Sequence, residues 1–162
     1  LGASTGALFG LVFAYSRKSL PGNNDIKKAL ILAGIMWAVL YFIPFLKYPA
    51  NPPTVGEPDT IALRASTYAL FVALSGFAAI GFSILYKKMK DKKFLAFVGY
   101  AGFMGIIFVI MPPNPDSIKT PIELVNGFRA ISAGTMTVYW IANGIILGWM
   151  WKKVKPDAIS TS

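Results

Sequence analysis

The sequence predicts an all-α integral membrane protein, a bundle of five transmembrane helices. Of its residues, 55% are hydrophobic and only 14% are charged, whereas soluble domains carry about 25% charged residues. Apolar runs recur at roughly the 20-residue length that crosses the hydrocarbon core of a bilayer. Prolines, glycines and charged residues separate these runs. We therefore expect a single membrane domain over residues 1–162.

Five apolar runs define the predicted spans. In chain order the spans are 1–15, 29–46, 65–86, 94–111 and 130–151. The first is short and has a glycine at every fourth position, at Gly2, Gly6 and Gly10. Such a stripe lets helices approach closely in lipid, so it is expected to pack inside the protein or to form a dimer seam. The second span is expected to end at Pro44 and the fourth at Pro112.

Basic residues predict the orientation of the spans. Twelve of the 16 Lys and Arg residues follow the first and third spans or lie in the C-terminal tail. Cytoplasmic loops carry the excess of basic residues. The N-terminus is therefore expected outside and the C-terminus in the cytoplasm, in a multi-pass protein of the plasma membrane. Topology thus accounts for the net charge of +9 without a nucleic-acid partner.

The two predicted outer loops, 47–64 and 112–129, carry the candidate metal ligands. Hard oxygen donors such as carboxylates and amides suit divalent cations, and the candidates here are Asn51, Glu57, Asp59 and Asp116. The spacing matches no known metal loop. An alternative is structural: Glu57 and Asp59 pair with Arg64, while Asp59 or Thr60 caps the third helix. Both readings can hold together.

Five further residues are candidates for structural or gating roles. Pro52 and Pro53 stiffen the first outer loop. Arg64 and Arg129 begin the third and fifth spans, where they either form structural ion pairs with loop carboxylates or release those carboxylates when a cation binds. Asn143 is expected to form a hydrogen bond with another helix. A hydrated ion path lined by Ser132, Thr135 and Asn143 is the alternative.

Several classes of function are excluded by composition. The sequence has no cysteine and no histidine, which rules out thiolate metal sites, cysteine nucleophiles and a Ser-His-Asp triad. No nucleotide-binding motif and no acidic residue inside a predicted span appears. We therefore expect neither an enzyme nor an intrinsic cofactor.

A family resemblance is carried by two stretches, PFLKYPANPPTVGEPDTIALR at 44–64 and FRAISAG at 128–134. These resemble the CbtA family, five-span membrane proteins described as cobalt transporter subunits. The resemblance implies cobalt uptake for cobalamin synthesis, together with a small single-span partner that bears terminal histidines. The matching positions are Lys47, Pro49, Asn51, Pro52, Pro53, Gly56, Asp59, Arg64, Phe128, Arg129 and Ser132. The second outer loop departs from the family pattern, because Pro115 follows Asn114 where an acidic residue is expected.

Two functions follow as hypotheses. The first is a membrane subunit of a divalent metal uptake system, with acidic outer loops that attract cobalt or another divalent cation. The second is an accessory, structural subunit of a larger membrane enzyme complex, for example an oxidase or monooxygenase. The expected partners are the lipid bilayer and other membrane subunits.

Overall fold

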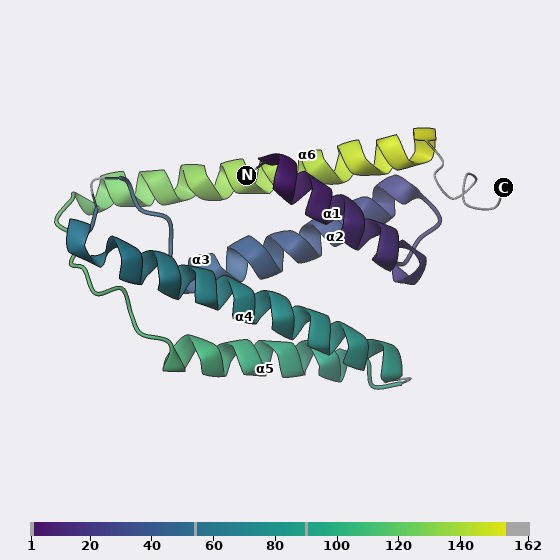
Figure 1. Cartoon of the computed structure of the whole chain (residues 1–162), viewed down its shortest axis with the longest axis horizontal. Coiled ribbons are helices and arrows are strands. Elements are labelled where there is room, and N and C mark those ends of the chain that lie inside the picture. The colour runs from purple at the N-terminus through teal and green to yellow at the C-terminus, as the bar shows by residue number, and fades with distance from the viewer. Residues whose placement is uncertain (1, 54, 90, 155–162) are drawn as a thin grey trace. The chain divides into compact units, whose positions relative to one another are not determined.

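All regular structure in the described part of the chain is helical (Figure 1). The computed structural model describes residues 2–53, 55–89 and 91–154. Its α-helices are α1 (Gly2–Ser16), α2 (Asp25–Trp37), α3 (Ile43–Lys47), α4 (Ile61–Lys88), α5 (Phe94–Ile110) and α6 (Ile122–Val154). Its shorter helices are η1 (Arg17–Ser19), η2 (Ala38–Phe42) and η3 (Pro58–Thr60). The all-helical prediction is confirmed.

Three helical segments are long and apolar enough to cross a membrane. They are Asp25–Lys47, Pro58–Lys88 and Ile122–Val154, with 23, 31 and 33 residues. The apolar helix α5 has 17 residues and α1 has 15, both slightly below the length of a typical span. The membrane character of the protein follows from the three long helices, whereas the count of five spans stays a prediction.

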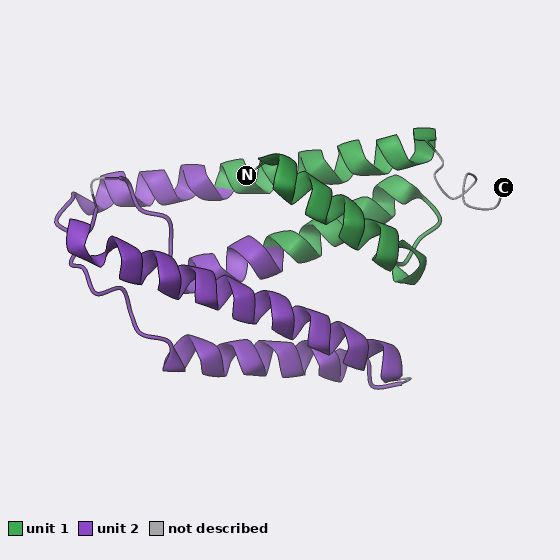
Figure 2. Ribbon diagram, in the orientation of Figure 1, with its two compact units in different colours: residues 1–37, 134–162 green, residues 38–133 purple. Residues whose placement is uncertain are grey.

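The chain divides into two compact units (Figure 2). Unit 1 consists of residues 1–37 and 134–162, and therefore contains α1, α2 and the C-terminal part of α6. Unit 2 consists of residues 38–133 and contains η2, α3, η3, α4, α5 and the start of α6.

Two glycines bring α2 and α6 together in unit 1. A Cβ built on Gly148 would lie 2.5 Å from the Ile26 Cα atom, and one on Gly144 would lie 3.0 Å from Leu30 Cδ2. Because these glycines are four residues apart, they share one face of α6. This is the close approach that small residues permit between membrane helices.

The stripe predicted from Gly2, Gly6 and Gly10 makes no such approach. Among the described residues, no atom lies within 4 Å of a Cβ built on any of the three. Instead α1 packs through two buried aromatic residues. Phe9 meets Trp140 edge to face at 5.8 Å between ring centroids, and Phe13 meets Trp151 at 5.1 Å. Within the described part of unit 1, the stripe therefore makes no close helix contact of the kind that Gly144 and Gly148 make.

In unit 2, the π-helix η2 allows the helix to continue past Pro44. Helix continues through η2 and α3 to Lys47, past Pro44 and one residue beyond the predicted second span, 29–46. Proline has no N–H, so the Val39 carbonyl cannot receive a π-type bond from the residue five positions later. The Oγ atom of the fully buried Ser75 donates to that carbonyl at 2.6 Å and lies 2.8 Å from the Tyr100 hydroxyl. This polar contact joins η2, α4 and α5.

Two helices begin inside the predicted outer loops. Helix α6 begins at Ile122 and α4 at Ile61, so 122–129 of the predicted second outer loop and the end of the first are helical. Pro121 precedes α6, and its carbonyl accepts from the N–H of Val125 at 3.2 Å. Glu123 lies in the first turn, where a negative charge is favourable. The predicted boundaries marked where apolar sequence begins, whereas the helices extend beyond it.

Candidate functional site

The two predicted outer loops meet at one end of unit 2. The Lys47 Nζ atom donates to the Phe108 carbonyl at 2.7 Å, and the Tyr48 hydroxyl donates to the Pro112 carbonyl at 2.6 Å. Both bonds connect the end of α3 to the end of α5. They bring residues 55–60 close to Asp116 and thereby form the candidate site.

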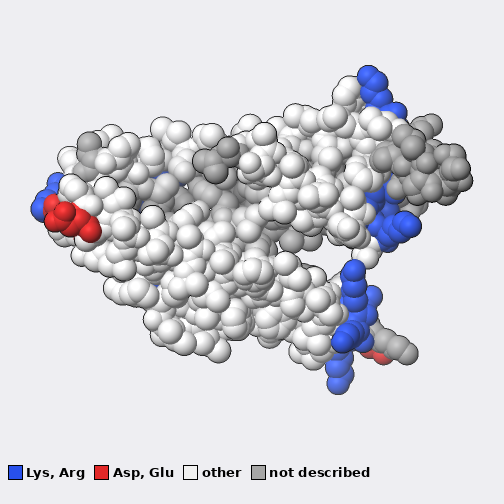
Figure 3. All heavy atoms as spheres, in the orientation of Figure 1, with Lys and Arg blue, Asp and Glu red and all other residues white. Residues whose placement is uncertain are grey.

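The two ends of unit 2 differ in their balance of charge (Figure 3). The turn between α4 and α5 carries the described lysines Lys87, Lys88, Lys92 and Lys93. The end formed by the two loops carries the four carboxylates Glu57, Asp59, Asp116 and Glu123 together with the four basic residues Lys47, Arg64, Lys119 and Arg129. This arrangement agrees with a basic side and a side of balanced charge of one membrane segment.

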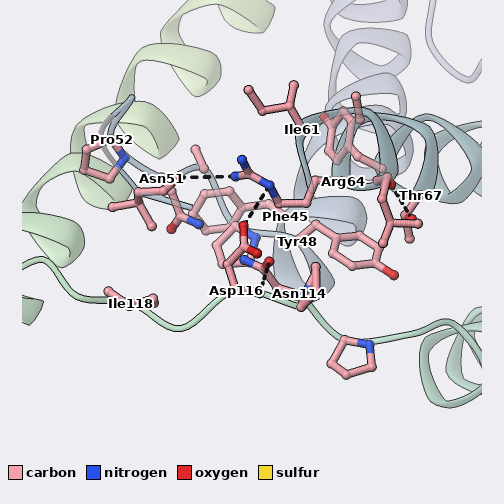
Figure 4. Close-up of a pocket in the computed structure, with 18 of the residues that line it drawn as sticks. Phe45, Tyr48, Asn51, Pro52, Ile61, Arg64, Thr67, Asn114, Asp116 and Ile118 are labelled. Atoms are coloured by element: carbon pink, nitrogen blue, oxygen red, sulfur yellow. Dashed lines mark hydrogen bonds and ion pairs between the residues drawn. The ribbon is translucent and has the colours of Figure 1, made fainter. Parts of the chain in front are cut away.

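Asp116 and Arg64 form the centre of the site (Figure 4). The Arg64 Nε atom lies 3.0 Å from Asp116 Oδ2, in an ion pair. The same oxygen accepts from the Thr60 hydroxyl at 2.7 Å and from the Glu57 backbone N–H at 3.1 Å. The Asp116 side chain is only 3% exposed. Its carboxylate is therefore fixed by one ion pair and two hydrogen bonds from the first loop and the start of α4.

These donors keep Asp116 ionised. The Thr60 hydrogen bond, followed by the Glu57 backbone N–H and the charges of Arg64 and Lys119, holds the pKa of the Asp116 carboxyl below its usual value, although burial opposes the shift. At neutral pH the Arg64–Asp116 contact is therefore a full ion pair.

Gly56 lets the first loop wrap closely around this pair. Its φ of +103° lies in a region that favours glycine. A Cβ at this position would fall against the Arg64 guanidinium and 2.7 Å from Asp116 Oδ2. Two further bonds hold the guanidinium, to the Val55 and Glu57 carbonyls at 3.2 Å each. The turn at Gly56 is thus shaped around the ion pair.

The structure changes the predicted partner of Arg64. Its partners predicted from the sequence were Glu57 and Asp59, but its carboxylate partner is Asp116 of the second loop. Glu57 instead pairs with Lys119 at 2.6 Å. That contact is at the surface, with side chains 56% and 76% exposed. The Glu57 carboxylate raises the pKa of Lys119.

Asp59 and Thr60 occupy the start of α4. Asp59 is exposed in the first turn of η3, and among the described residues it has no ion pair. Thr60 is the N-cap residue of α4, as one of the two predicted alternatives, but no side-chain cap bond forms there. Its hydroxyl is used for Asp116 and for the Glu57 carbonyl, at 2.9 Å from the latter.

Asn51 and Arg129 form a second polar contact. The Asn51 Oδ1 atom accepts from Arg129 Nη2 at 2.8 Å and from Nε at 3.3 Å. Arg129 was expected to pair with a loop carboxylate, and the structure gives it a neutral amide instead. The same contact engages the oxygen that made Asn51 a candidate metal ligand.

Pro52 and Pro53 lie in the wall of a cavity beside these contacts. Pro52 is buried, and its carbonyl accepts from the Val55 N–H at 3.0 Å, which closes a turn. The cavity has a volume of about 680 Å³. Its lining includes Tyr41, Phe45, Tyr48, Asn51, Arg64, Tyr68, Asp116 and Arg129 (Figure 4).

Asn143 lies outside this site. Its side-chain amide donates at 2.8 Å to the Tyr139 carbonyl, one turn earlier on α6. The predicted bond to another helix is therefore not the one formed. A buried side chain that does form a hydrogen bond to another helix is Ser75, which was not among the residues selected from the sequence. The sequence feature that could have indicated this contact is Pro44, which has no N–H and therefore leaves the Val39 carbonyl to be satisfied by another donor.

Two acidic residues of the site, Glu57 and Asp116, are paired with basic ones. Across the residues that the structure describes, no three acidic side chains gather closely enough to hold a metal ion. Glu57 and Asp116 lie next to each other through the Glu57 N–H, but each carboxylate already has a cationic partner. A cation entering here would have to displace Lys119 or Arg64.

Comparisons with known proteins give one match. A family described as "Probable cobalt transporter subunit (CbtA)" matches residues 1–152. No curated protein and no solved structure matches the chain.

Proposed function

Because this chain belongs to the CbtA family, we propose that it is the membrane subunit of a divalent metal uptake system, with cobalt as the transported ion. The family match over residues 1–152 carries this proposal. A transporter subunit suggests a non-enzymatic role. Cobalt or another divalent cation is thus cargo, and the chain needs no cofactor of its own.

We propose five spans with the N-terminus outside and the C-terminus in the cytoplasm of the plasma membrane. The described lysines at the turn between α4 and α5, opposite the two loops of balanced charge, support this orientation. The chain has no cysteine, so single cysteines can report topology. A membrane-impermeant maleimide added to intact cells should label Ser117→Cys and leave Lys87→Cys unlabelled. The reverse pattern would invert the orientation.

Capture at the outer face is assigned to Glu57 and Asp59. Both are exposed, and Asp59 has no ion pair among the described residues. Exposed carboxylates raise the local concentration of cations and the rate of their arrival. This rate effect weakens as salt screens the charge.

The Arg64–Asp116 pair is assigned the role of a charge gate. A divalent cation has twice the charge of the guanidinium and competes with it for the same carboxylate. Once released, Arg64 can no longer hold the turn at residues 55–57, since it binds the carbonyls of Val55 and Glu57. Displacement would therefore loosen the first loop from the second. Further ligands would come from water or from a histidine-bearing partner subunit.

Cobalt uptake by cells that depend on this system tests the capture role. The double variant Glu57→Gln and Asp59→Asn should lower the initial uptake rate at low salt and lose its effect at high salt. The matched control is Glu123→Gln, which removes an exposed carboxylate from the first turn of α6. Uptake that is unchanged in the double variant at low salt would refute capture by this loop.

An accessory subunit of a larger membrane enzyme complex is the second candidate. Within the described part of unit 1, the space beside Gly2, Gly6 and Gly10 is open, which favours this candidate because a small-residue face can accept a helix of another subunit. Mild-detergent purification with mass spectrometry separates the two functions. A small histidine-bearing single-span protein supports uptake, and large redox or hydrolytic subunits in fixed ratio support the accessory role.

A further inference from the structure

The cavity between the two loops of unit 2 has an unbalanced positive charge. Its charged lining consists of two arginines and one aspartate. Arg64 and Asp116 neutralise each other in the ion pair at 3.0 Å. Arg129 contacts only the neutral Asn51 amide oxygen, and among the described residues it has no carboxylate partner. A half-buried guanidinium without a counter-charge is costly unless an anion joins it.

A second observation, a buried hydroxyl without a partner in the described part of the chain, points to a ligand in the same cavity. Tyr41 lines it and is only 8% exposed, and its hydroxyl oxygen has no hydrogen-bond partner among the described residues. Most buried hydroxyl groups in native proteins are satisfied, so each exception calls for a specific explanation. A ligand with polar oxygens would satisfy this one.

The remaining lining is apolar and aromatic. Phe45, Tyr48 and Tyr68 contribute rings, and six prolines complete the wall. The volume of about 680 Å³ lies within the roughly 300–1,000 Å³ of small-molecule sites. The cavity thus suits a ligand with an oxyanion and an apolar body.

The location of the cavity indicates the source of that ligand. It lies where α3 and α5 end and α4 begins, with Tyr48 and Tyr68 in its wall. Tyrosines collect at the depth of lipid headgroups. A guanidinium fork matches phosphate oxygens in two-pronged contacts. We infer that this cavity binds the phosphate-bearing headgroup of an anionic phospholipid, with Arg129 as the phosphate contact.

Lipid binding here does not require the transported ion, although Arg64 and Asp116 of the proposed charge gate also line the cavity. The phosphate oxygens neutralise Arg129, and the acyl chains leave along the apolar ends of the helices. A bound lipid would fill the space between the two loops and so stabilise them against each other. Its binding can be measured on the chain alone, with no transported ion and no partner subunit.

The test uses the full chain, stripped of lipid in detergent, and three probes. These are short-chain phosphatidylglycerol, short-chain phosphatidylcholine and inorganic phosphate. Native mass spectrometry and the melting temperature report binding. Phosphatidylglycerol should bind most tightly, because phosphatidylcholine carries a cation beside its phosphate.

Two variants remove the charge of the site by different routes. Arg129→Gln removes the guanidinium, and Asn51→Asp keeps it but places a carboxylate against it. Each should weaken phosphatidylglycerol binding about tenfold, the value of one charge-assisted hydrogen bond. Asn51→Asp also strengthens the contact within the protein, so it remains informative if Arg129→Gln does not fold. The control Lys87→Gln removes an exposed charge at the other end of α4 and should leave binding unchanged.

Tyr41→Phe tests the hydroxyl separately. It should weaken phosphatidylglycerol binding without lowering the melting temperature of the lipid-free chain, because no bond within the described protein is lost. Unchanged affinity in this variant removes the hydroxyl from the site.

Two results would overturn the inference. One is phosphatidylglycerol affinity that stays the same in both Arg129→Gln and Asn51→Asp, or that falls equally in Lys87→Gln. The other is inorganic phosphate that binds as tightly as phosphatidylglycerol and competes with it. In that case the cavity serves a soluble oxyanion and not a lipid.

Discussion

Replacing Gly56 with alanine tests how the first loop holds the Arg64–Asp116 pair. Two costs arise. The backbone φ of +103° is strained for any residue with a Cβ, by about 1–3 kcal/mol. The new Cβ would also lie 2.7 Å from Asp116 Oδ2 and against the Arg64 guanidinium, and such overpacking costs typically about 1–3 kcal/mol. The expected loss of unfolding free energy is therefore about 2–6 kcal/mol, the sum of these two ranges.

Gly22→Ala is the matched control for the backbone term. Gly22 has a φ of +107°, but its Cβ would meet only the flexible Lys27 side chain, 3.2 Å from Cδ. This variant should lose about 1–3 kcal/mol, from backbone strain alone. Both are measured by denaturant titration of the purified chain in detergent, with hydrogen exchange at residues 55–60 to localise the change. Equal losses in the two variants would refute the idea that Gly56 is required by the ion pair.

Three further predictions follow from other contacts. Ser75→Ala should lower the free energy of unfolding by about 1–3 kcal/mol, because it leaves the Val39 carbonyl of η2 unsatisfied. The Ser83 hydroxyl is exposed and bonds within its own helix, so Ser83→Ala should lower it by less in the same denaturant titration. Gly148→Ala should lower the melting temperature by separating α2 from α6, whereas Gly134→Ala, which faces open space, should not. Because the pKa of Asp116 is lowered in the folded protein, its carboxylate contributes stability that is fully present above the usual pKa of 3.8 and is lost as pH falls through the lowered value. Hydrogen exchange at residues 55–60 should accelerate in that acidic range, and Asp116→Asn should remove this pH dependence.

The helical class of the protein could be predicted from hydrophobic run length alone. Length and composition decide whether a segment is helical in lipid. They do not decide where such a helix ends. Pro44 is a usual stop signal, and yet helix continues past it, because η2 shifts the bonding and Ser75 satisfies the carbonyl that Pro44 cannot. That solution depends on a residue 36 positions away, which local sequence rules do not see.

The same limit explains the glycine stripe. The physical rule that small residues permit close helix approach is correct, but the sequence offers several glycine pairs at spacing four. Gly144 and Gly148 make the close approach, and the more regular stripe that begins at Gly2 does not. Which pair is used depends on which helix lies opposite, and that is a tertiary property.

The residue types at the candidate site could be predicted, but their pairing could not. Acidic and basic residues in both loops, 47–64 and 112–129, indicated that ion pairs or a cation site would form there. Within one loop, Glu57 and Asp59 are the nearest partners in sequence for Arg64. The fold instead brings Asp116 to Arg64 and Lys119 to Glu57, across more than 50 positions. Metal binding by these residues remains a prediction.

The most direct test of the proposed uptake function is the initial rate of cobalt uptake in cells that carry Asp116→Asn. The matched control is Asp25→Asn, which removes the other aspartate paired with an arginine, at 2.7 Å from Arg17. With equal amounts of each protein in the membrane, we expect uptake to fall in Asp116→Asn and to remain at the wild-type rate in Asp25→Asn. Wild-type uptake in Asp116→Asn would contradict passage of the cation by way of this carboxylate.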